Sequence, residues 1–360
     1  MNATLAAAQE QRPVAVVLGV DTHQLTHHAA LIDSQGRRLA DREFEVTRAG
    51  YADLLAWANA YSSTGTITAA GVESTGSYGA GLTRHLLVAG VDVIEVNQPE
   101  KSSRFKQGKS DPIDAYSAAE QTRTGRATGR PKITTGAVEA LRMLMVPRER
   151  AVKDRTAAYS QLRDLITAAP APIRELLIAL TGKQRVAKAL TFRPDPARLH
   201  EPDHAAKYAM RTLAKRISHL DTEIAQADKD IAALTRTIVP TLLSMRQVGP
   251  ITAAQLAISA GENIDRMTSE ASFAKLAGVA PLPASSGKTH RHRLNPGGDR
   301  KANWALYMIT TGRMKNHPAT RDYVQRRTTE GLSNPEIIRC LKRHLARGVY
   351  QALRTDLMTP

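Results

Sequence analysis

The sequence predicts a three-part chain: an α/β domain, a long helical middle region and a mainly helical C-terminal part. Two observations carry this prediction. Over residues 14–125, β-rich apolar runs alternate with helical patterns. Beyond residue 126, long segments carry apolar residues at three- and four-residue spacing, which is typical of helices. In the first part, a strand hairpin followed by crossover connections indicates a mixed sheet flanked by helices.

Each element of the α/β domain is predicted from a local pattern. Residues 14–20, Val-Ala-Val-Val-Leu-Gly-Val, are typical of a buried strand that ends at Asp21. Apolar runs between turn residues predict further strands at 28–33, 38–46, 66–72 and 91–96. Helical spacing predicts helices at 50–61, at 77–89 and from Asp114 onward. Residues 1–13 are expected to be a disordered N-terminus.

Four carboxylates come from three distant segments of this domain. Asp21 ends the first strand and Glu73 ends the fourth, while Asp111 and Asp114 open the last helix beside Pro112. Residues three apart on a helix share a face, and loops at strand ends gather side chains over a sheet. Hard divalent cations choose oxygen ligands, so the four acids predict a two-metal site for phosphodiester chemistry. The alternative for the helical pair is an N-cap with a second acid that favours the helix dipole.

The composition favours a polyanionic partner. Lys and Arg number 50 against 34 acids, a formal net charge of +16, which favours nucleic acid over a membrane surface. Cys340 is the only cysteine, which excludes an intrachain disulfide and a Cys-based zinc site. No apolar run approaches the ~20 residues that span a bilayer, and residues 1–13 lack a signal core. We expect a soluble bacterial cytoplasmic protein, associated with the nucleoid when active, without a membrane partner.

Three segments of the α/β domain resemble the DEDD catalytic domain of insertion-sequence transposases. They are Gly19–His23, Gly71–Tyr78 and Lys109–Ala115. That family includes the Piv DNA invertases and the bridge-RNA-guided recombinases, and its domain has a RuvC-like ribonuclease H fold. The resemblance covers residues 14–125 and resumes near residue 240. It implies that Mg²⁺, or Mn²⁺ in its place, is bound by Asp21, Glu73, Asp111 and Asp114.

The middle region, residues 126–240, carries few motifs. A basic, Gly-rich linker at 125–135 precedes long helices expected at 141–168 and 205–238. The second helix has an apolar seam, interrupted at Asp228, that comprises Leu213, Ile217, Leu220, Ile224, Ile231 and Leu234. The seam indicates either a coiled-coil assembly arm or a helix packed on its own protein.

The C-terminal part, residues 241–360, opens with a candidate phosphate-binding turn. Gly249 separates two helical stretches, as in helix-hairpin-helix units, which hold phosphate through backbone N–H groups. Further helices are expected at 304–313 and 335–347. The second of these predicts a basic face for a nucleic-acid backbone, or simply a solvated one, formed by Arg339, Lys342, Arg343 and Arg347.

A serine-bearing loop lies between these helical segments. Taken alone, Ser285-Ser286-Gly287 is a flexible loop followed by cations. However, residues 276–281, Ser286-Gly287 and 295–299 resemble the family's C-terminal transposase domain, in which a serine immediately before glycine is the nucleophile. The match falls on Ser286, with Ser285 as a nearby competitor. Residues 295–298, Asn-Pro-Gly-Gly, stand where relatives often carry Ser-Lys-Arg-Gly. The expected nucleic-acid contacts are Lys109, Lys288, Arg291, Arg293, Arg300 and Lys301.

The sequence therefore predicts a DNA transposase or recombinase that cleaves strands through a covalent phosphoserine–DNA intermediate at Ser286. The resemblance further implies a guide (bridge) RNA that pairs with donor and target DNA, and a homo-oligomer between dimer and tetramer. Three alternatives stay open. They are a RuvC-like nuclease that hydrolyses junction DNA with water, a non-catalytic nucleic-acid-binding protein, and an actin- or sugar-kinase-like ATPase. The last is disfavoured because no glycine-rich phosphate turn follows Asp21.

Overall fold

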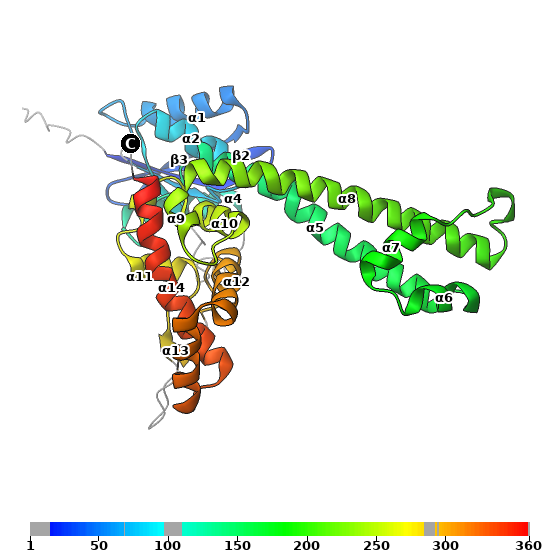
Figure 1. The fold of residues 1–360 in the computed structure, drawn as a ribbon. Helices are drawn as coiled ribbons and strands as arrows, with labels where there is room; N and C mark the ends of the chain where they lie inside the picture. The colour runs from blue at the N-terminus through cyan, green and yellow to red at the C-terminus, as the bar shows by residue number, and fades with distance from the viewer. Residues whose placement is uncertain (1–14, 68, 97–109, 284–291, 294, 359–360) are drawn as a thin grey trace, which may run out of the picture. The chain divides into compact units, whose positions relative to one another are not determined.

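The computed structural model describes residues 15–67, 69–96, 110–283, 292–293 and 295–358. They divide into two compact units, an α/β unit up to Thr135 and a helical unit from Gly136 (Figure 1). The predicted α/β domain followed by a mainly helical chain is thus confirmed. The expected disordered N-terminus, 1–13, lies outside the described residues.

A five-stranded mixed sheet forms the α/β unit, with the strand order β3-β2-β1-β4-β5. The first three strands are antiparallel: β1 (Val16–Thr22), β2 (Thr26–Asp33) and β3 (Arg38–Glu45). The other two run parallel to β1: β4 (Ala69–Glu73) and β5 (Asp92–Val96). The helices are α1 (Arg48–Ala60), α2 (Ala80–Val88) and α4 (Asp111–Arg123).

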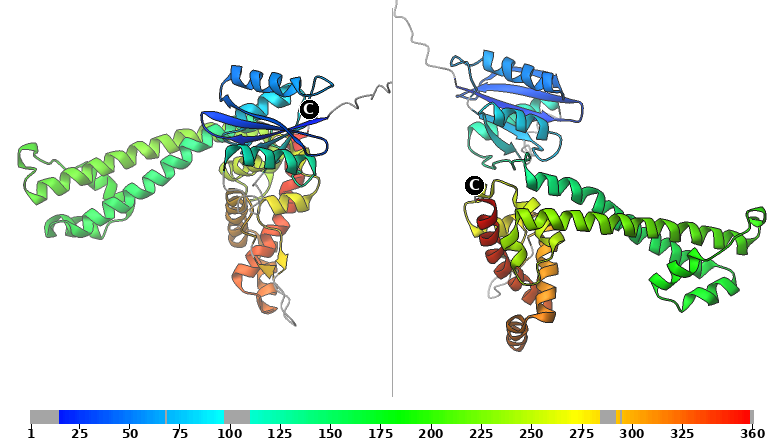
Figure 2. Two further views of the ribbon diagram at one scale, coloured as in Figure 1. Left: turned by 180° about the vertical axis from the view of Figure 1, so that it is seen from behind. Right: turned by 45° about the horizontal axis from the view of Figure 1, so that its top comes forward.

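The alternation of side chains along β1 explains how helices cover both faces of the sheet. Leu18 belongs to a core that contains Leu54 of α1 and Leu82 of α2. Its neighbour Val17 points to the opposite face, where it packs with Ala115 and other residues of α4. In the left view of Figure 2 the sheet lies between helices on its two sides. The central strands β1 and β4 are covered on both faces and are apolar over most of their length, whereas the edge strand β3 is charged and mostly exposed.

The predicted elements occur in the expected order, with shifts at their ends. The expected helix at 77–89 begins only at Ala80, because Ser74 has φ 49° and the chain turns there. Backbone N–H groups of Ser77 and Gly79 both donate to Ser74 O in this turn. The predicted linker, 125–135, is part of the α/β unit and hydrogen-bonds to strand β5, with Glu95 N donating to Gly129 O at 2.6 Å.

Two long helices run side by side in the helical unit: α5 (Ala137–Ala168) and α8 (Pro202–Ile238) (Figures 1 and 2). The predicted seam of α8 packs on α5 of the same chain, where Leu220 and Ile224 bury against Ala151. Asp228, which interrupts the seam, accepts a 2.5 Å hydrogen bond from Arg148 of α5. Within the described residues, the seam therefore serves intrachain packing.

Short helices connect the C-terminal end of α5 to the N-terminal end of α8, and the sequence did not predict them. They are α6 (Ala171–Ile178), α7 (Gly182–Leu190) and the 3₁₀ turn η1 (Pro196–Arg198). Their apolar residues, including Ile173, Leu177 and Val186, share a core with Leu162 of α5 and Met210 of α8. This cluster closes the loop between the two long helices.

The remaining helices form a second core. They are α9 (Pro240–Ser244), α10 (Pro250–Ala260), η2 (Ile264–Arg266), α11 (Glu270–Leu276), α12 (Arg300–Asn316), α13 (Pro318–Thr329) and α14 (Asn334–Leu357), with a two-stranded ladder of β6 (Leu282–Pro283) and β7 (His292–Arg293). Leu256, Phe273, Leu306 and Val349 are buried between α10, α11, α12 and α14. Among the residues described, no helix is both long and apolar enough to cross a membrane.

Gly249 lies between α9 and α10, as the candidate phosphate-binding turn requires. It is the N-cap of α10 with φ −95°, whereas the left-handed residue of the turn is Gln247, with φ 63°. A Cβ at Gly249 would meet no atom within 4 Å. The turn therefore does not depend on this glycine for space or conformation.

Candidate active site

The acidic site is built where α4 lies on strand β1. A Cβ at Gly19 would lie 2.1 Å from Ala115 O, so only glycine lets the helix approach this closely. Ser110 is the N-cap of α4, and Asp111 and Asp114 both lie in its first turn. The close packing therefore holds two carboxylates near the last residues of β1.

Asp21, Asp111 and His23 converge at this end of the sheet. His23 Nε2 lies 3.3 Å from Asp21 Oδ2 and 3.4 Å from Asp111 Oδ1. One ligand atom from each of the three residues lies within 4.8 Å of the others. The Asp21 side chain is 10% exposed, whereas those of Asp111 and His23 are about half exposed. The cluster is thus anchored in the sheet and open to solvent on one side.

The electrostatics of the cluster favour a bound cation. Burial raises the pKa of the Asp21 carboxyl, and the Asp111 and Asp114 carboxylates raise it further, while His23 opposes them. Asp114 itself is 2% exposed. Ionised carboxylates held this close repel one another unless a positive charge lies between them. Oxygen ligands with one imidazole nitrogen suit a divalent cation.

Glu73 ends β4, next to β1. Val20 and Val72 are register partners, so Asp21 and Glu73 each follow a paired residue on neighbouring strands. Thr22 Oγ1 donates to Glu73 O at 3.3 Å, and the Glu73 Oε1 atom is buried. Glu73 and Asp114 flank the cluster but are not among the three residues whose ligand atoms lie within 4.8 Å.

The sequence predicted no role for His23, although this residue ends the segment Gly19–His23 that resembles the transposase family. The available signal was its spacing, because residues two apart at the end of a strand point to the same side. His23 N donates to Thr26 O at 3.1 Å, which closes the turn between β1 and β2. The hairpin therefore positions the imidazole next to Asp21.

The serine belongs to the helical unit. Ser286, its competitor Ser285, and the predicted contacts Lys109, Lys288 and Arg291 lie outside the described residues. Strands β6 and β7 pair through Leu282–Arg293 and Pro283–His292. In the chain, these two paired strands precede and follow residues 284–291.

Three of the predicted nucleic-acid contacts are described. Arg293 and Arg300 are exposed. Lys301 Nζ lies 2.6 Å and 2.8 Å from the two carboxylate oxygens of Glu149. The charge of Lys301 is therefore balanced by an intramolecular ion pair, whereas the exposed arginines remain suitable for a phosphate backbone.

The predicted basic face of α14 needs correction. Arg343 and Arg347 lie 3.2 Å and 2.8 Å from carboxylate oxygens of Glu270. Lys342 is only 6% exposed. These residues do not form one solvated stripe, because Glu270 of α11 pairs with Arg343 and Arg347, and the buried Lys342 donates to Asn303 of α12.

The fold and the site define an α/β protein with an acidic candidate metal centre, followed in the chain by a helical unit. A family model described as "Transposase" matches residues 18–169, and one described as "Transposase IS116/IS110/IS902 family" matches residues 239–325. The chain belongs to this family of insertion-sequence transposases. Membership implies DNA as a partner and a divalent metal.

Curated relatives are proteins of insertion elements. The 42 kDa protein of IS900 from Mycobacterium paratuberculosis is 24% identical over 379 residues, covering 93% of this chain and 95% of the relative. The 44.8 kDa protein of IS116 from Streptomyces clavuligerus is 26% identical over 294 residues, covering 71% and 73%. The 43.6 kDa protein of IS110 from Streptomyces coelicolor is 32% identical over 116 residues, covering 32% and 28%.

Proposed function

We propose that the protein is a DNA recombinase that cleaves and exchanges strands through a phosphoserine–DNA intermediate, with Mg²⁺ or Mn²⁺ held by Asp21, Glu73, Asp111 and Asp114. The convergence of Asp21 and Asp111 on His23 supports this proposal most directly. The bound ion would neutralise the scissile phosphate. The acids would hold this ion in a defined position, since Asp21 is fixed by the sheet and Asp111 by the close-packed helix.

Ser286 is proposed as the nucleophile. Its Oγ forms a bond to phosphorus and loses its proton, while the bond from phosphorus to the departing DNA oxygen breaks and that oxygen gains a proton. A hydroxyl of a second strand then displaces Ser286, which restores a phosphodiester. Because the intermediate keeps the phosphodiester energy, strand exchange needs no ATP.

Further parts of the proposal concern architecture and partners. The sheet order, with three antiparallel strands followed by two parallel ones, supports a RuvC-like ribonuclease H fold for residues 14–125. The middle part would be 126–240 and the C-terminal transposase domain 241–360. A bridge RNA would select donor and target DNA, and a dimer or tetramer would hold the strands together.

The test is a cleavage assay on element-end DNA with the full chain, resolved on denaturing gels. With Mg²⁺ we expect a covalent protein–DNA adduct, and with EDTA we expect none. Asp111→Asn and Asp114→Asn should abolish the adduct but retain DNA binding. Full cleavage by either variant would remove that acid from the site.

A second candidate is a RuvC-like nuclease that uses water. It is favoured by the fact that Asp21, His23 and Asp111 form their cluster within the α/β unit alone. Free DNA ends without adduct in the same assay would select this hydrolytic enzyme. DNA binding without any cleavage would leave a non-catalytic binding protein.

A further inference from the structure

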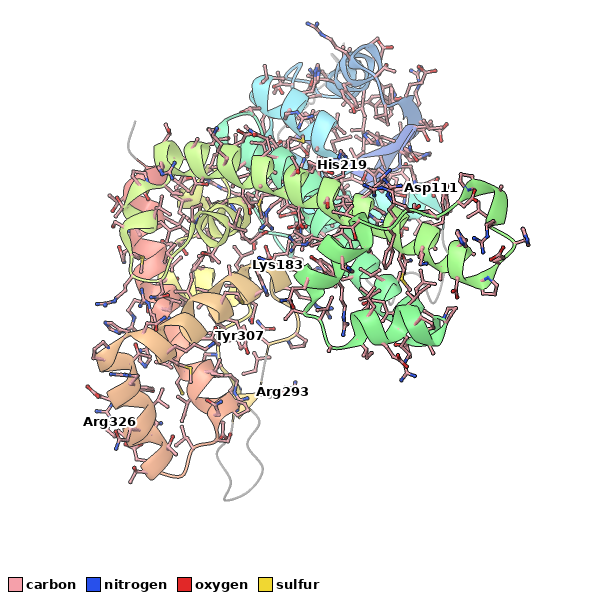
Figure 3. The ribbon with its side chains drawn as sticks, turned by 45° about the vertical axis from the view of Figure 1, so that its right-hand side comes forward. Asp111, Lys183, His219, Arg293, Tyr307 and Arg326 are labelled. Carbon is pink, nitrogen blue, oxygen red and sulfur yellow. The ribbon has the colours of Figure 1, made fainter. Side chains whose placement is uncertain are left out.

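A cationic pocket of about 590 Å³ lies in the helical unit. It is bounded by the segment 278–281 after α11, by β7, by the end of α13 and by the first half of α14. Glu336 is the one acid among its described lining residues. Figure 3 labels Arg293, one of the cations that line it. The others are Arg327, Arg339, Lys342 and Arg343.

Lys342 is the buried cation of this pocket. Its Nζ donates to Asn303 Oδ1 at 2.7 Å, and Asn303 Nδ2 donates to the carbonyls of Ala277 and Gly278, each at 3.0 Å. Among the described residues, no carboxylate lies within 4.0 Å of this ammonium. Burial lowers the pKa of Lys342, and Arg339 lowers it further. A buried ammonium without a counter-ion is costly, so an anion would stabilise it.

Two further lining residues carry donors that lack an acceptor. Arg343 Nη1 and Arg327 Nε are buried and, within the described part of the chain, have no hydrogen-bond partner. A carboxylate anchors another atom of each guanidinium, Glu270 for Arg343 and Glu330 for Arg327. Buried donors are normally satisfied, and no described residue supplies an acceptor to either of these two atoms.

We infer that this pocket, the Lys342 pocket, binds one nucleotide of a DNA strand through its phosphodiester group. Phosphate oxygens accept hydrogen bonds from an ammonium and from guanidinium groups together. The apolar lining residues Val279, Pro281 and Leu332 offer a wall for the sugar and base. The volume is that of a site for a small organic molecule, which is larger than a bare anion needs.

This inference rests on the proposed function for the choice of DNA, because membership of the transposase family implies DNA as the partner. The inference adds a binding site for a DNA strand to the proposed function. The pocket includes Arg293 of β7, the strand that follows the serine-bearing segment in the chain. A nucleotide bound there would be held by a residue seven positions after Ser286 in the sequence.

Cys340, the only cysteine, lines the Lys342 pocket and gives a direct test. The full chain in EDTA is treated with maleimide, with and without a short single-stranded DNA. Saturating DNA should slow alkylation of Cys340 severalfold. An unchanged rate at saturation would overturn the inference, and protection by RNA of the same sequence but not by DNA would overturn the choice of DNA.

Variants sharpen the test through affinity for the same oligonucleotide. Lys342→Met should weaken binding about tenfold or more, because a hydrogen-bonded charge contact is lost. The matched control is Lys315→Met, the same replacement at an exposed position of α12 outside the pocket, which should change affinity about twofold or less. Equal effects of the two variants would contradict the pocket.

If Lys342→Met fails to fold, Arg343→Lys keeps the positive charge but replaces the three guanidinium nitrogens by a single ammonium, so the buried Nη1 donor is lost. It should still weaken binding and reduce protection of Cys340, and wild-type values for both would contradict the pocket. Because all these measurements use EDTA, they are independent of cleavage. If DNA protects Cys340 but the protein never cleaves DNA, the proposed function is wrong. The inferred nucleotide binding by the Lys342 pocket would still be supported.

Discussion

Gly19 of β1 and Gly71 of β4 are register partners on adjacent parallel strands, and both lie under α4. A Cβ at Gly19 would lie 2.1 Å from Ala115 O, and one at Gly71 would lie 2.7 Å from Ala118 O. Neither glycine has a positive φ, so space rather than conformation requires them. This contact brings the first turn of α4 to the strand ends that carry Asp21 and Glu73.

Gly19→Ala should therefore destabilise the protein, because the new methyl group overlaps the backbone of α4. We expect a loss of about 1–3 kcal/mol in the free energy of unfolding, measured by urea titration. Gly76→Ala is the control, since a Cβ there meets nothing within 4 Å. Wild-type stability of Gly19→Ala would mean that α4 can move away from the sheet without cost.

His23→Ala should weaken Mn²⁺ binding to the full chain by about tenfold, as measured by calorimetry. Mg²⁺ binding should change less, because Mg²⁺ prefers oxygen ligands and imidazole suits transition metals. His28→Ala is the matched control, since His28 bonds to Asp41 at 2.8 Å and lies outside the cluster. Tighter metal binding by His23→Ala would show that the imidazole competes with the ion.

Asp33 should contribute stability that depends on pH. Burial raises the pKa of Asp33, but hydrogen bonds from the Arg37 side chain and from the backbones of Arg37 and Gln35 outweigh burial, so its pKa is lowered. The contribution is therefore present above the unfolded pKa of about 3.9 and is lost as pH falls through the lower folded value.

Urea unfolding of wild type and Asp33→Asn between about pH 6 and about pH 2 tests this. The difference in stability between them should be largest at the upper end and shrink toward acid. Asp53→Asn, an exposed carboxyl on α1, is the control. A difference that stays constant with pH would contradict the assignment.

Ser286→Ala should eliminate both the protein–DNA adduct and recombination, whereas Ser285→Ala should retain a measurable fraction of each. If the serine only lines a loop, loss of its hydroxyl removes one hydrogen bond and costs about 1 kcal/mol in stability. Loss of a nucleophile would instead abolish the covalent step. Denaturing gels of the two variants provide the measurement. Adduct from Ser286→Ala but not from Ser285→Ala would shift the nucleophile by one residue. Normal recombination by the double variant would rule out the serine mechanism.

The sequence by itself determined the order of elements in the α/β unit. Residues 16–20 form a continuous apolar run, which is typical of a strand that is buried on both faces of a sheet. This local pattern is sufficient to predict the strand. The ends of elements were less well predicted. The helix α2 begins after the predicted residue 77 because the backbone turns at Ser74. No local sequence pattern predicted the left-handed conformation of Ser74.

The acids Asp21, Glu73, Asp111 and Asp114 were also chosen from sequence, since strand ends and helix starts can be found locally. The tertiary structure decided which of them converge, since Asp21 and Asp111 lie 3.3 Å and 3.4 Å from His23 Nε2. It added His23, whose ring lies between Asp21 and Asp111, because the turn after β1 closes on Thr26. That geometry combines segments about ninety residues apart, which periodicity does not relate to one another.

In the helical unit, α14 shows most clearly which properties local sequence predicts and which depend on tertiary packing. Helical spacing indicated that Lys342 and Arg343 belong to one basic helix, and this is correct. Only the tertiary structure decided that Lys342 is buried against Asn303 and that Arg343 reaches Glu270, which is 73 residues away in the chain. Spacing tells which residues share a helix face, but the segment that packs on that face decides whether a charge meets water, a carboxylate or an enclosed pocket.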